Sequence, residues 1–551
     1  MKKIIFILGL AAVVLGTSCS DVLDLNPADR FSPATVWSTT TTADKYVIGL
    51  YSIFGANTEM RGGDAYASPR LSDAYSDILK STSWNQYNHN FNATLLQETA
   101  FNSNSAGAFE CWSSHYDRIR HENEFLRDAA EFGSKFGEDW LKIRIAEVRF
   151  CRAYAYFMLC RVYGGVILRT EVDGPEQNDK ARSTEEECWG FIINELKELA
   201  PDLPLKWDSD NSGRATQKAA YGLLSRVALY AEKWDVAAQA ARDCATAEGN
   251  LDLSENGYAK IFELGINSPE VLFAVEFKSS VIDHAYDAYV RPSGDTKELG
   301  KQVYSGFVPT SELVDSYEMA GDGGNFSWEK HGKDPYANRE PRFYATILYN
   351  GADWMGRKIE SFVGGKDGYK AYENAGAAGT TVTGYYLRKY LIDGDKTWVT
   401  SGSGQDWIVL RYAEVLLNKA EALAMENWNK NSAEALQALN DVRARVGLPA
   451  RATADKETFL EYVRHERKVE LAGEGFRYWD LRRWRLAEKV IDGQNVHGVK
   501  ISKQSDGSFT YEQVDADGGH KRIFYDRYYR FAIPLSERSN NSLCTNNDGW
   551  I

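Results

Sequence analysis

Residues 411–445 read RYAEVLLNKAEALAMENWNKNSAEALQALNDVRAR, and the spacing of apolar residues in this stretch decides the fold class. Apolar residues recur every three or four positions before the polar segment 428–431 and again after it, which is the period of a helix face. The first stripe contains Ala413, Leu416, Ala420 and Leu423, and the returning stripe contains Ala435, Leu436 and Leu439. The stretch therefore predicts two helices joined by a turn, within a helical unit that spans 408–445.

A similar helix–turn–helix pattern occurs earlier in the chain, at 215–244. Small Ala residues on the facing sides let two helices pack closely, and a tryptophan near each turn, Trp234 and Trp428, closes the end of the pair. Stacked antiparallel helix pairs of this kind are typical of tetratricopeptide-like proteins. We therefore predict a mainly α fold of tetratricopeptide-like stacked helix pairs with long irregular loops and a few short strands.

Two local signals mark the ends of further helices. Gly164 and Gly165 follow a long apolar stripe and predict the end of a helix at 138–163. Ser183 followed by Glu186 has the spacing of a capping box and predicts the start of the next helix. Additional helical stripes predict helices at 36–56, 106–131, 456–473 and 476–491.

The remaining segments have a different composition. Residues 251–405 are rich in Gly, Tyr and Asp and contain short apolar runs, which favours irregular loops with some short strands. The predicted organisation is a helical region at 36–250 with a loop insertion at 58–105, an irregular region at 251–405 and a helical region at 406–551. Long ordered loops are uncommon in compact domains unless they are functional, so these loops are the expected binding face.

Charge limits the classes of ligand. The chain has 551 residues, of which 78 are acidic and 64 basic, which gives a formal net charge of −14. Binding to phosphate backbones needs clustered Lys and Arg, so the balance argues against nucleic acid and against strongly sulfated or carboxylated polymers. His and Cys never cluster at zinc spacing, and no C-x-x-C pair occurs, so neither a metal site nor a disulfide framework is predicted.

The N-terminus carries an export signal. Lys2 and Lys3 precede the apolar run 4–15, which is shorter than the roughly 20 residues of a membrane span and predicts a signal peptide at 1–18. Small residues lead into Cys19, and this arrangement resembles a bacterial lipoprotein box, in which the cysteine is lipidated. Residues 19–35 then form the predicted tether. An ordinary signal peptide beside an unrelated cysteine is the alternative.

Several motifs in order along the chain resemble the SusD/RagB family of Gram-negative outer-membrane lipoproteins. The segments that carry the resemblance are 146–154, Gly213-Arg214-Ala215-Thr216, Asn338-Arg339-Glu340-Pro341-Arg342-Phe343, Arg411-Tyr412-Ala413-Glu414, Glu466-Arg467, Glu474-Gly475-Phe476-Arg477, Asp480-Leu481-Arg482-Arg483-Trp484 and Asn547-Asp548-Gly549-Trp550. Glu340 stands where the family usually has Asp. The similarity runs from the lipidation site to the last residue.

The resemblance implies an extracellular binding protein, neither an enzyme nor a cofactor-dependent protein. Such proteins are anchored by lipid to the outer membrane, face outward, and sit as a lid on a SusC-like TonB-dependent transporter for which they capture oligosaccharides. A peptide-binding RagB-like member of the same family is one alternative function. A glycoside hydrolase is the other, since paired carboxylates such as Asp73 and Asp77 could perform that chemistry.

Aromatic side chains in the loops are the candidate glycan contacts, because a sugar ring has an apolar face. Trp84 lies in the polar stretch 81–88 with no apolar partner at core spacing, which predicts a stacking platform. Tyr87, Asp73 and Tyr75 are its predicted companions. Tyr286, Tyr289 and Tyr304 fall where the family resemblance implies ligand aromatics.

Two other motifs are assigned no ligand. The signature residues Glu466, Arg467, Glu470, Arg477 and Asp480 have helical spacing that favours ion pairs between turns, so a structural role is predicted. The segment Asp515-Ala516-Asp517-Gly518-Gly519 is suggestive of a calcium loop but lacks the later acidic ligand.

Overall fold

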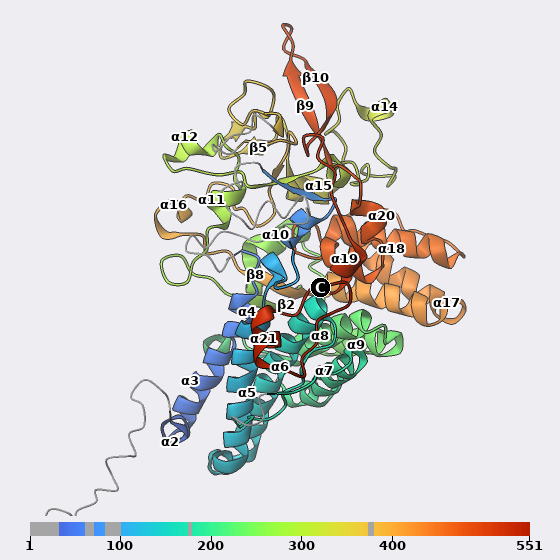
Figure 1. Ribbon diagram of the computed structural model, residues 1–551. Helices are drawn as coiled ribbons and strands as arrows, with labels where there is room; N and C mark the ends of the chain where they lie inside the picture. The colour runs from blue at the N-terminus through green and yellow to red at the C-terminus, as the bar shows by residue number, and fades with distance from the viewer. Residues whose placement is uncertain (1–31, 61–70, 83–100, 175–178, 373–379, 551) are drawn as a thin grey trace, which may run out of the picture.

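The computed structural model describes residues 32–60, 71–82, 101–174, 179–372 and 380–550. Long helices form the lower part and the right side of the molecule in Figure 1, and mostly irregular segments form the upper part. The long helices are α5 (Trp112–Phe132), α6 (Glu138–Tyr163), α7 (Glu185–Leu199), α8 (Gln217–Tyr230), α9 (Trp234–Thr246), α17 (Tyr412–Arg445) and α18 (Lys456–Glu470). Each of these helices packs against the next one in this order. The prediction of a mainly α fold of stacked helices is confirmed.

Shorter helices complete the two ends of the array. α2 (Pro33–Val36), α3 (Thr40–Leu50) and α4 (Ser52–Ala56) replace the single helix predicted at 36–56, and α3 packs on α5 and α6. At the other end, α19 (Arg477–Arg483) and α20 (Ala487–Ile491) replace the helix predicted at 476–491, and α21 (Leu535–Asn540) lies near the C-terminus.

Helix boundaries follow local backbone chemistry. Gly164 ends α6 at the predicted position, with a φ of 75° that glycine adopts readily. The capping box begins one residue later than predicted. The Thr184 hydroxyl accepts the Glu187 N–H at 3.2 Å, and the Glu187 carboxylate accepts the Thr184 N–H at 2.8 Å. The extended backbone of Thr184 (φ −61°, ψ 157°) makes it, rather than Ser183, the residue before the helix.

The predicted turn at 428–431 corresponds to a break inside α17. Asn427 has non-helical angles (φ −165°, ψ 94°), one residue before the predicted turn. The predicted start at 408 is corrected, because residues Trp407–Arg411 form a strand, β8. Likewise α5 begins at Trp112 rather than at 106.

The strands pair in twos, and all the pairs within the described residues are antiparallel. The pairs are β1 (Leu79–Ser81) with β3 (Phe307–Pro309), β2 (Val271–Val275) with β8, β4 (Ile347–Leu348) with β7 (Tyr386–Leu387), β5 (Asp353–Trp354) with β6 (Arg357–Lys358), and β9 (His497–Lys503) with β10 (Phe509–Asp515). The β9–β10 hairpin, which the sequence did not predict, stands at the top of the molecule in Figure 1.

The irregular region leaves and rejoins the helical array through one strand pair. In the β2–β8 ladder Val271 lies opposite Arg411 and Val275 lies opposite Trp407, so residues 276–406 form an insertion between two adjacent strands. We call residues 276–406 the loop region. It is more helical than predicted and contains α11 (Tyr286–Val290), α12 (Asp295–Leu299), α13 (Ser311–Val314), α14 (Trp328–His331), α15 (Pro341–Thr346) and α16 (Trp398–Ser401); α10 (Gly257–Leu264) precedes it.

No helix among the described residues is both long and apolar enough to cross a membrane. The six cysteines in the described part of the chain are free thiols, of which Cys111 is partly exposed and the others are buried. One large hydrophobic core runs through the helical array and the loop region, and a smaller one, around Trp37 and Phe125, lies under α3.

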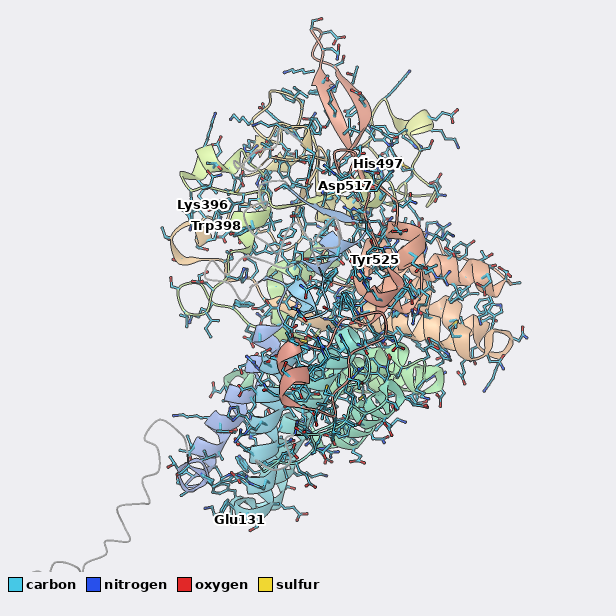
Figure 2. The ribbon with its side chains drawn as sticks, viewed as in Figure 1. Glu131, Lys396, Trp398, His497, Asp517 and Tyr525 are labelled. Carbon is cyan, nitrogen blue, oxygen red and sulfur yellow. The ribbon has the colours of Figure 1, made fainter. Side chains whose placement is uncertain are left out.

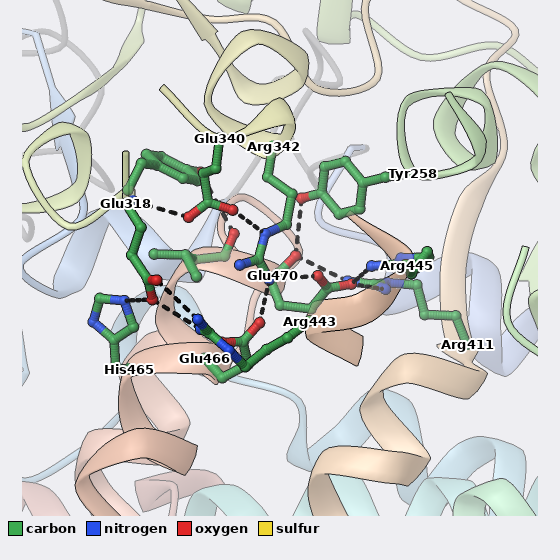
Figure 3. A network of polar contacts seen from close by, with 12 residues as sticks. Tyr258, Glu318, Glu340, Arg342, Arg411, Arg443, Arg445, His465, Glu466 and Glu470 are labelled. Carbon is green, nitrogen blue, oxygen red and sulfur yellow. Dashed lines mark hydrogen bonds and ion pairs between the residues drawn. The ribbon is translucent and has the colours of Figure 1, made fainter. Parts of the chain in front are cut away.

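A network of buried ion pairs joins the loop region to the C-terminal helices (Figure 3). Arg411, at the end of β8, is 1% exposed and contacts Glu270 at 2.9 Å and Glu470 at 2.6 Å. Arg342, from α15, contacts Glu470 at 2.9 Å and Glu466 at 2.5 Å. The predicted structural role of the α18 glutamates is confirmed, although their partners lie on other elements.

The charges of the network hold each other in the ionised state. Burial alone raises the pKa of Glu470, but the guanidinium groups of Arg445, Arg411 and Arg342 outweigh burial and hold the pKa well below its usual range. Removing one arginine leaves buried carboxylates with fewer counter-charges than they need, which costs more than the pair contributes in isolation.

Arg411→Met should therefore destabilise the fold by about 3–5 kcal/mol, the usual cost of breaking a buried pair. Urea unfolding, followed by circular dichroism, measures the change. The matched control is Arg242→Met, which removes an arginine from the half-exposed pair with Glu434 and should change stability little. Equal unfolding midpoints for the two variants would contradict the assignment.

One buried carboxyl group, that of Glu122, lies outside this network and has no hydrogen-bond partner among the described residues. Glu122 on α5 is fully buried, and neither of its carboxyl oxygens has a hydrogen-bond partner in the part of the chain that the structure describes. Burial raises its pKa to about 8, although Arg152 and Arg118 act in the opposite direction. The folded chain therefore keeps this carboxyl group neutral at pH values where the unfolded chain ionises it.

The free energy of unfolding of Glu122→Gln, relative to that of the wild type, should increase as the pH rises from 4.5 to about 8. In this interval the wild-type carboxyl group ionises only on unfolding, so the wild type loses stability as pH rises, by at most about 1.4 kcal/mol per pH unit. Urea unfolding at pH 5 and pH 8 measures the difference between the two proteins. Glu131→Gln, at the exposed end of α5 (Figure 2), is the control. A difference that is the same at both pH values would refute the assignment.

Candidate functional site

A hollow of about 480 Å³ lies between α11, α16 and the segment 301–304. We call it the tyrosine hollow. Trp398, which lines the hollow from α16, is labelled in the left part of Figure 2. The lining residues are Ser280, Asp283, His284, Ala285, Ala288, Tyr289, Lys301, Gln302, Tyr304, Trp398, Thr400, Ser401, Gly402 and Ser403. A hollow of this size falls in the range of small-molecule sites, about 300–1,000 Å³.

Tyr289 and Tyr304 form the aromatic wall of the tyrosine hollow. Their ring centres lie 4.8 Å apart, with an angle of 40° between the ring planes. The Tyr304 N–H donates to the Ala288 carbonyl at 2.7 Å, which fixes the segment 301–304 against α11. Tyr289 is 5% exposed and Tyr304 is half-buried. The pair therefore forms a firmly held wall in which Tyr304 is the more exposed ring.

Trp398 contributes to the lining from α16. It is almost fully buried, and the Lys301 ammonium lies 5.2 Å from its ring centre. Lys301 Nζ also donates to the Val399 carbonyl at 2.6 Å and to the Trp398 carbonyl at 3.3 Å. The lysine is thus committed to carbonyl oxygens of α16, and its contribution is to hold α16 against the segment 301–304.

The floor of the hollow contains a histidine in a fixed orientation. His284 Nδ1 accepts the Tyr286 N–H at 3.2 Å, so its Nε2 carries the hydrogen that is donated to the Gln405 carbonyl at 2.9 Å. His284 and Ser403 also form a β-bridge, and both are buried. These contacts give His284 a structural role.

Uncharged polar groups and one carboxylate are exposed at the hollow. Asp283, Gln302 and Thr400 supply a carboxylate, an amide and a hydroxyl group. Together with the ring wall, this set suits a molecule with one apolar face and a rim of hydroxyl groups.

A second hollow, of about 630 Å³, borders the first, since Ser279 lines one and Ser280 the other. Its acidic lining consists of Glu263, Glu276, Asp395 and Asp406. The Asp406 carboxylate accepts the N–H groups of Ile266 and Phe277 at 3.0 and 3.1 Å, and burial raises its pKa. Asp406 thereby holds two loops together.

The structure brings two of the predicted contacts, Tyr289 and Tyr304, to one hollow. Trp84, Tyr87 and the lipidation site Cys19 lie outside the described residues. The structure buries the remaining three predicted contacts, Asp73, Tyr75 and Tyr286.

Asp73 is fully buried on η2 (Ser72–Tyr75). Its carboxylate accepts the backbone N–H groups of Gly473, Gly475 and Arg477 at 2.9, 3.2 and 2.9 Å. Burial nevertheless raises its pKa to about 6. Asp73 therefore fastens η2 to the start of α19, and it presents no surface to a sugar.

Tyr75 and Tyr286 belong to the core. Tyr75 is 5% exposed and packs against Phe109 and Tyr478, with ring centres 4.9 and 5.8 Å away. Tyr286 is fully buried, and its hydroxyl donates to the Lys389 carbonyl at 3.0 Å. Their partners lie far away in sequence, which local composition cannot reveal.

The other acidic motifs are also structural. Asp77 pairs with Arg477 at 2.8 Å, and Asp517, in the segment considered for calcium, pairs with Lys80 at 2.8 Å and Arg522 at 2.9 Å. No group of three or more His, Cys, Asp or Glu residues within the described ranges could hold a metal ion.

Sequence reasoning missed Trp398, Lys301 and Asp283. The signal for Trp398 was present, since it follows the polar stretch 393–397 without apolar partners at core spacing, as Trp84 does in its own stretch. Lys301 and Asp283 have no comparable signal, because their positions depend on the pairing of distant loops.

Comparisons with known proteins point to the same family in the N-terminal and the C-terminal parts of the chain. The profile of the SusD family matches residues 269–550, and a profile described as "Starch-binding associating with outer membrane" matches residues 21–229. A SusD-like protein of Bacteroides ovatus is 25% identical over 547 residues, covering 94% of this chain and 90% of the relative.

Solved structures show the same fold. A SusD-like protein from Bacteroides fragilis superposes with a TM-score of 0.79 at 27% identity, covering 94% of this chain and 98% of that one. Surface glycan-binding protein A from Bacteroides thetaiotaomicron, solved in complex with laminarihexaose, superposes with a TM-score of 0.66 at 18% identity, covering 92% and 99%. The family profile covers more than half of the chain and the helical array matches these structures, so the protein belongs to the SusD family.

Proposed function

We propose that the protein is a cell-surface glycan-binding lipoprotein that captures oligosaccharides and delivers them to a SusC-like TonB-dependent transporter in the outer membrane. The observation that carries this proposal is the tyrosine hollow, which combines a held ring pair with exposed amide, hydroxyl and carboxylate groups.

The lining of the hollow suits sugar chemistry. Covering one sugar face with one ring contributes on the order of 1 kcal/mol from buried area alone, so more than one ring is needed. Tyr289 and Tyr304 supply two adjacent rings. Hydrogen bonds to Asp283, Gln302 and Thr400 would then select among hydroxyl arrangements, because an unmatched polar group in the site costs binding energy.

The relatives indicate which ligands to test first. One structural relative was solved with laminarihexaose, and the profile matching the N-terminal part refers to starch. Both are neutral glucans, and neutral sugars suit a chain with a net charge of −14. We propose that capture leaves the glycan chemically unchanged.

Anchoring and partner complete the proposal. A lipid on Cys19 and the tether to residue 35 would hold the chain at the outer membrane, facing outward. The anchored protein would stay beside its transporter and could pass the captured glycan directly to it. A freely diffusing protein would not remain at that place.

Tyr304→Ala should weaken laminarihexaose binding about fivefold, since it removes one of the two rings that cover the sugar. The Tyr289→Ala, Tyr304→Ala double variant should weaken binding about 25-fold, since the two losses add. Titration calorimetry measures both. Tyr304→Phe, which keeps the ring, separates stacking from the hydroxyl hydrogen bond, and Tyr221→Ala on α8, away from the hollow, is the matched control.

Other outcomes would contradict the proposal. If wild-type protein binds neither laminarihexaose nor maltohexaose, or if Tyr304→Ala binds as tightly as wild type, the hollow is not the glycan site. Shorter products after incubation with either oligosaccharide would indicate a hydrolase. Saturable binding of peptides in place of glycans would indicate the RagB-like alternative.

Cys19→Ala should release the protein from the outer membrane, because the lipid is the proposed anchor. Metabolic labelling with radioactive palmitate should label the wild type and leave the variant unlabelled. After cell fractionation, the variant should be found in the soluble fraction. An alanine at Cys111, a partly exposed thiol, is the control. A Cys19→Ala protein that remains in the membrane fraction would show that another segment anchors it.

A further inference from the structure

A pocket at the ends of three long helices gathers arginines in an otherwise acidic protein. It lies between the end of α6, the start of α7, the end of α8, α19 and the C-terminal segment, and its volume is about 120 Å³. We call it the arginine pocket. Its lining is Cys160, Arg161, Glu185, Trp189, Tyr230, Glu232, Trp479, Arg482, Arg483, Arg485 and Arg530. The volume is several times the roughly 10–15 Å³ that one water molecule needs.

Arg482 is buried in this pocket with most of its hydrogen-bonding capacity unused. It is 4% exposed, and its Nη2 donates to the Tyr529 carbonyl at 2.9 Å. Its Nε and Nη1 have no hydrogen-bond partner within the described residues. Burial, together with the nearby charges of Arg530 and Arg161, lowers its pKa to about 10. A buried guanidinium without a counter-charge is unfavourable unless something else supplies one.

Arg161 is the second cation of the pocket with an unused donor. Its guanidinium lies 4.1 Å from the centre of the Trp479 ring, and Arg482 lies 4.7 Å from the same ring. The buried Nε of Arg161 has no hydrogen-bond partner among the described residues, and the charge of Arg161 acts on the buried Glu59 carboxyl group, whose pKa it lowers. The indole therefore holds two guanidinium groups beside one cavity, with donors of both unused.

The other charges of the arginine pocket are partly compensated. Arg530 pairs with Glu185 at 2.5 Å, and Arg483 is paired outside the pocket with Glu421. Arg485 is exposed at the rim. Arg485 also has Asp526 at 3.8 Å outside the pocket, and Glu232, which is exposed, is the lining carboxylate that remains to balance Arg161 and Arg482. The pocket therefore carries a local excess of positive charge.

We propose that the arginine pocket is an oxyanion-binding site, which takes a sulfate, phosphate or carboxylate group, either free or carried on a sugar. An oxyanion supplies both the missing charge and the missing acceptors, and guanidinium groups bind such ions through paired, charge-assisted hydrogen bonds. This site is separate from the tyrosine hollow and does not depend on the function proposed for it.

Titration calorimetry of the purified full-length chain with sodium sulfate and with sodium phosphate, at constant ionic strength, tests the proposal. We expect saturable binding at one site. Arg161→Gln should weaken it about tenfold, the effect of one charge-assisted hydrogen bond. Glu232→Gln should tighten it several-fold, because it removes the opposing carboxylate. Arg120→Gln, which removes the same charge from an exposed position on α5, should leave it unchanged.

Arg482 is avoided as a first variant because its burial links it to folding. Arg485→Gln, at the exposed rim, should weaken binding without affecting the fold and serves as the second test. Glucose 6-sulfate and glucuronic acid, compared with glucose, distinguish the source of the anion. Tighter binding of the sugar-borne anions assigns the site to an anionic saccharide, and equal binding assigns it to a free ion.

Two results would overturn the proposal. One is the absence of saturable binding for sulfate, phosphate and both anionic sugars. The other is binding that Arg161→Gln and Arg485→Gln weaken no more than Arg120→Gln does, which would reflect the general charge of the surface.

Discussion

Buried guanidinium–carboxylate contacts determine how the loop region is placed on the C-terminal helices. Arg411 ends β8, precedes α17 and contacts Glu270 at the foot of β2, so one side chain fixes the start and the end of the loop region. Glu470, on α18, binds Arg411 and also Arg342 from α15. Since each charge is costly to bury alone, the network is favourable only when all its partners are in place. This requirement gives one arrangement of the loops on the helices.

The tyrosine hollow is rigid because the loop region that forms it is held in one position on the helices. Its walls come from α11, the segment 301–304 and α16, which are all parts of the loop region. Each wall is tied to another by backbone or lysine contacts, such as Tyr304 to Ala288 and Lys301 to Val399. A site whose rings are already held in place loses little conformational entropy when a ligand binds. The helical array thus acts on binding indirectly, by holding the loops still.

Local signals in the sequence located the long helices, although several of their bounds and the short helices were missed. The apolar stripe and the glycine at 164 located both ends of α6, because helix formation depends on spacing and on backbone angles that neighbouring residues determine. The capping box was displaced by one residue, since Ser183–Glu186 and Thr184–Glu187 have the same spacing and only the backbone angles at Thr184 decide between them. The β9–β10 hairpin was missed because its outward-facing strands are largely polar.

The site was predictable only in part, for a different physical reason. Tyr289 and Tyr304, predicted from the family resemblance, line the tyrosine hollow, whereas Tyr75 and Tyr286 lie in the hydrophobic core and Asp73 is fully buried. Their burial depends on partners hundreds of positions away, such as Gly473 for Asp73. Likewise, the spacing of Glu466 and Glu470 suggested pairs between turns of one helix, but Arg342 and Arg411 come from other elements. The spacing of residues in a helix indicates which side chains share one face of it. It does not indicate which other element packs against that face.

The closing of the loop region by a single ladder, β2 with β8, has an evolutionary consequence. Because the two ends of the insertion are adjacent, segments between them that make no contact with the helices can lengthen or shorten while the helices keep their packing, whereas Arg342 and β3 must keep their partners Glu470 and β1. Changes in loop length can therefore accumulate within one continuous segment of the gene, provided that the contacts that attach this segment to the helices are kept.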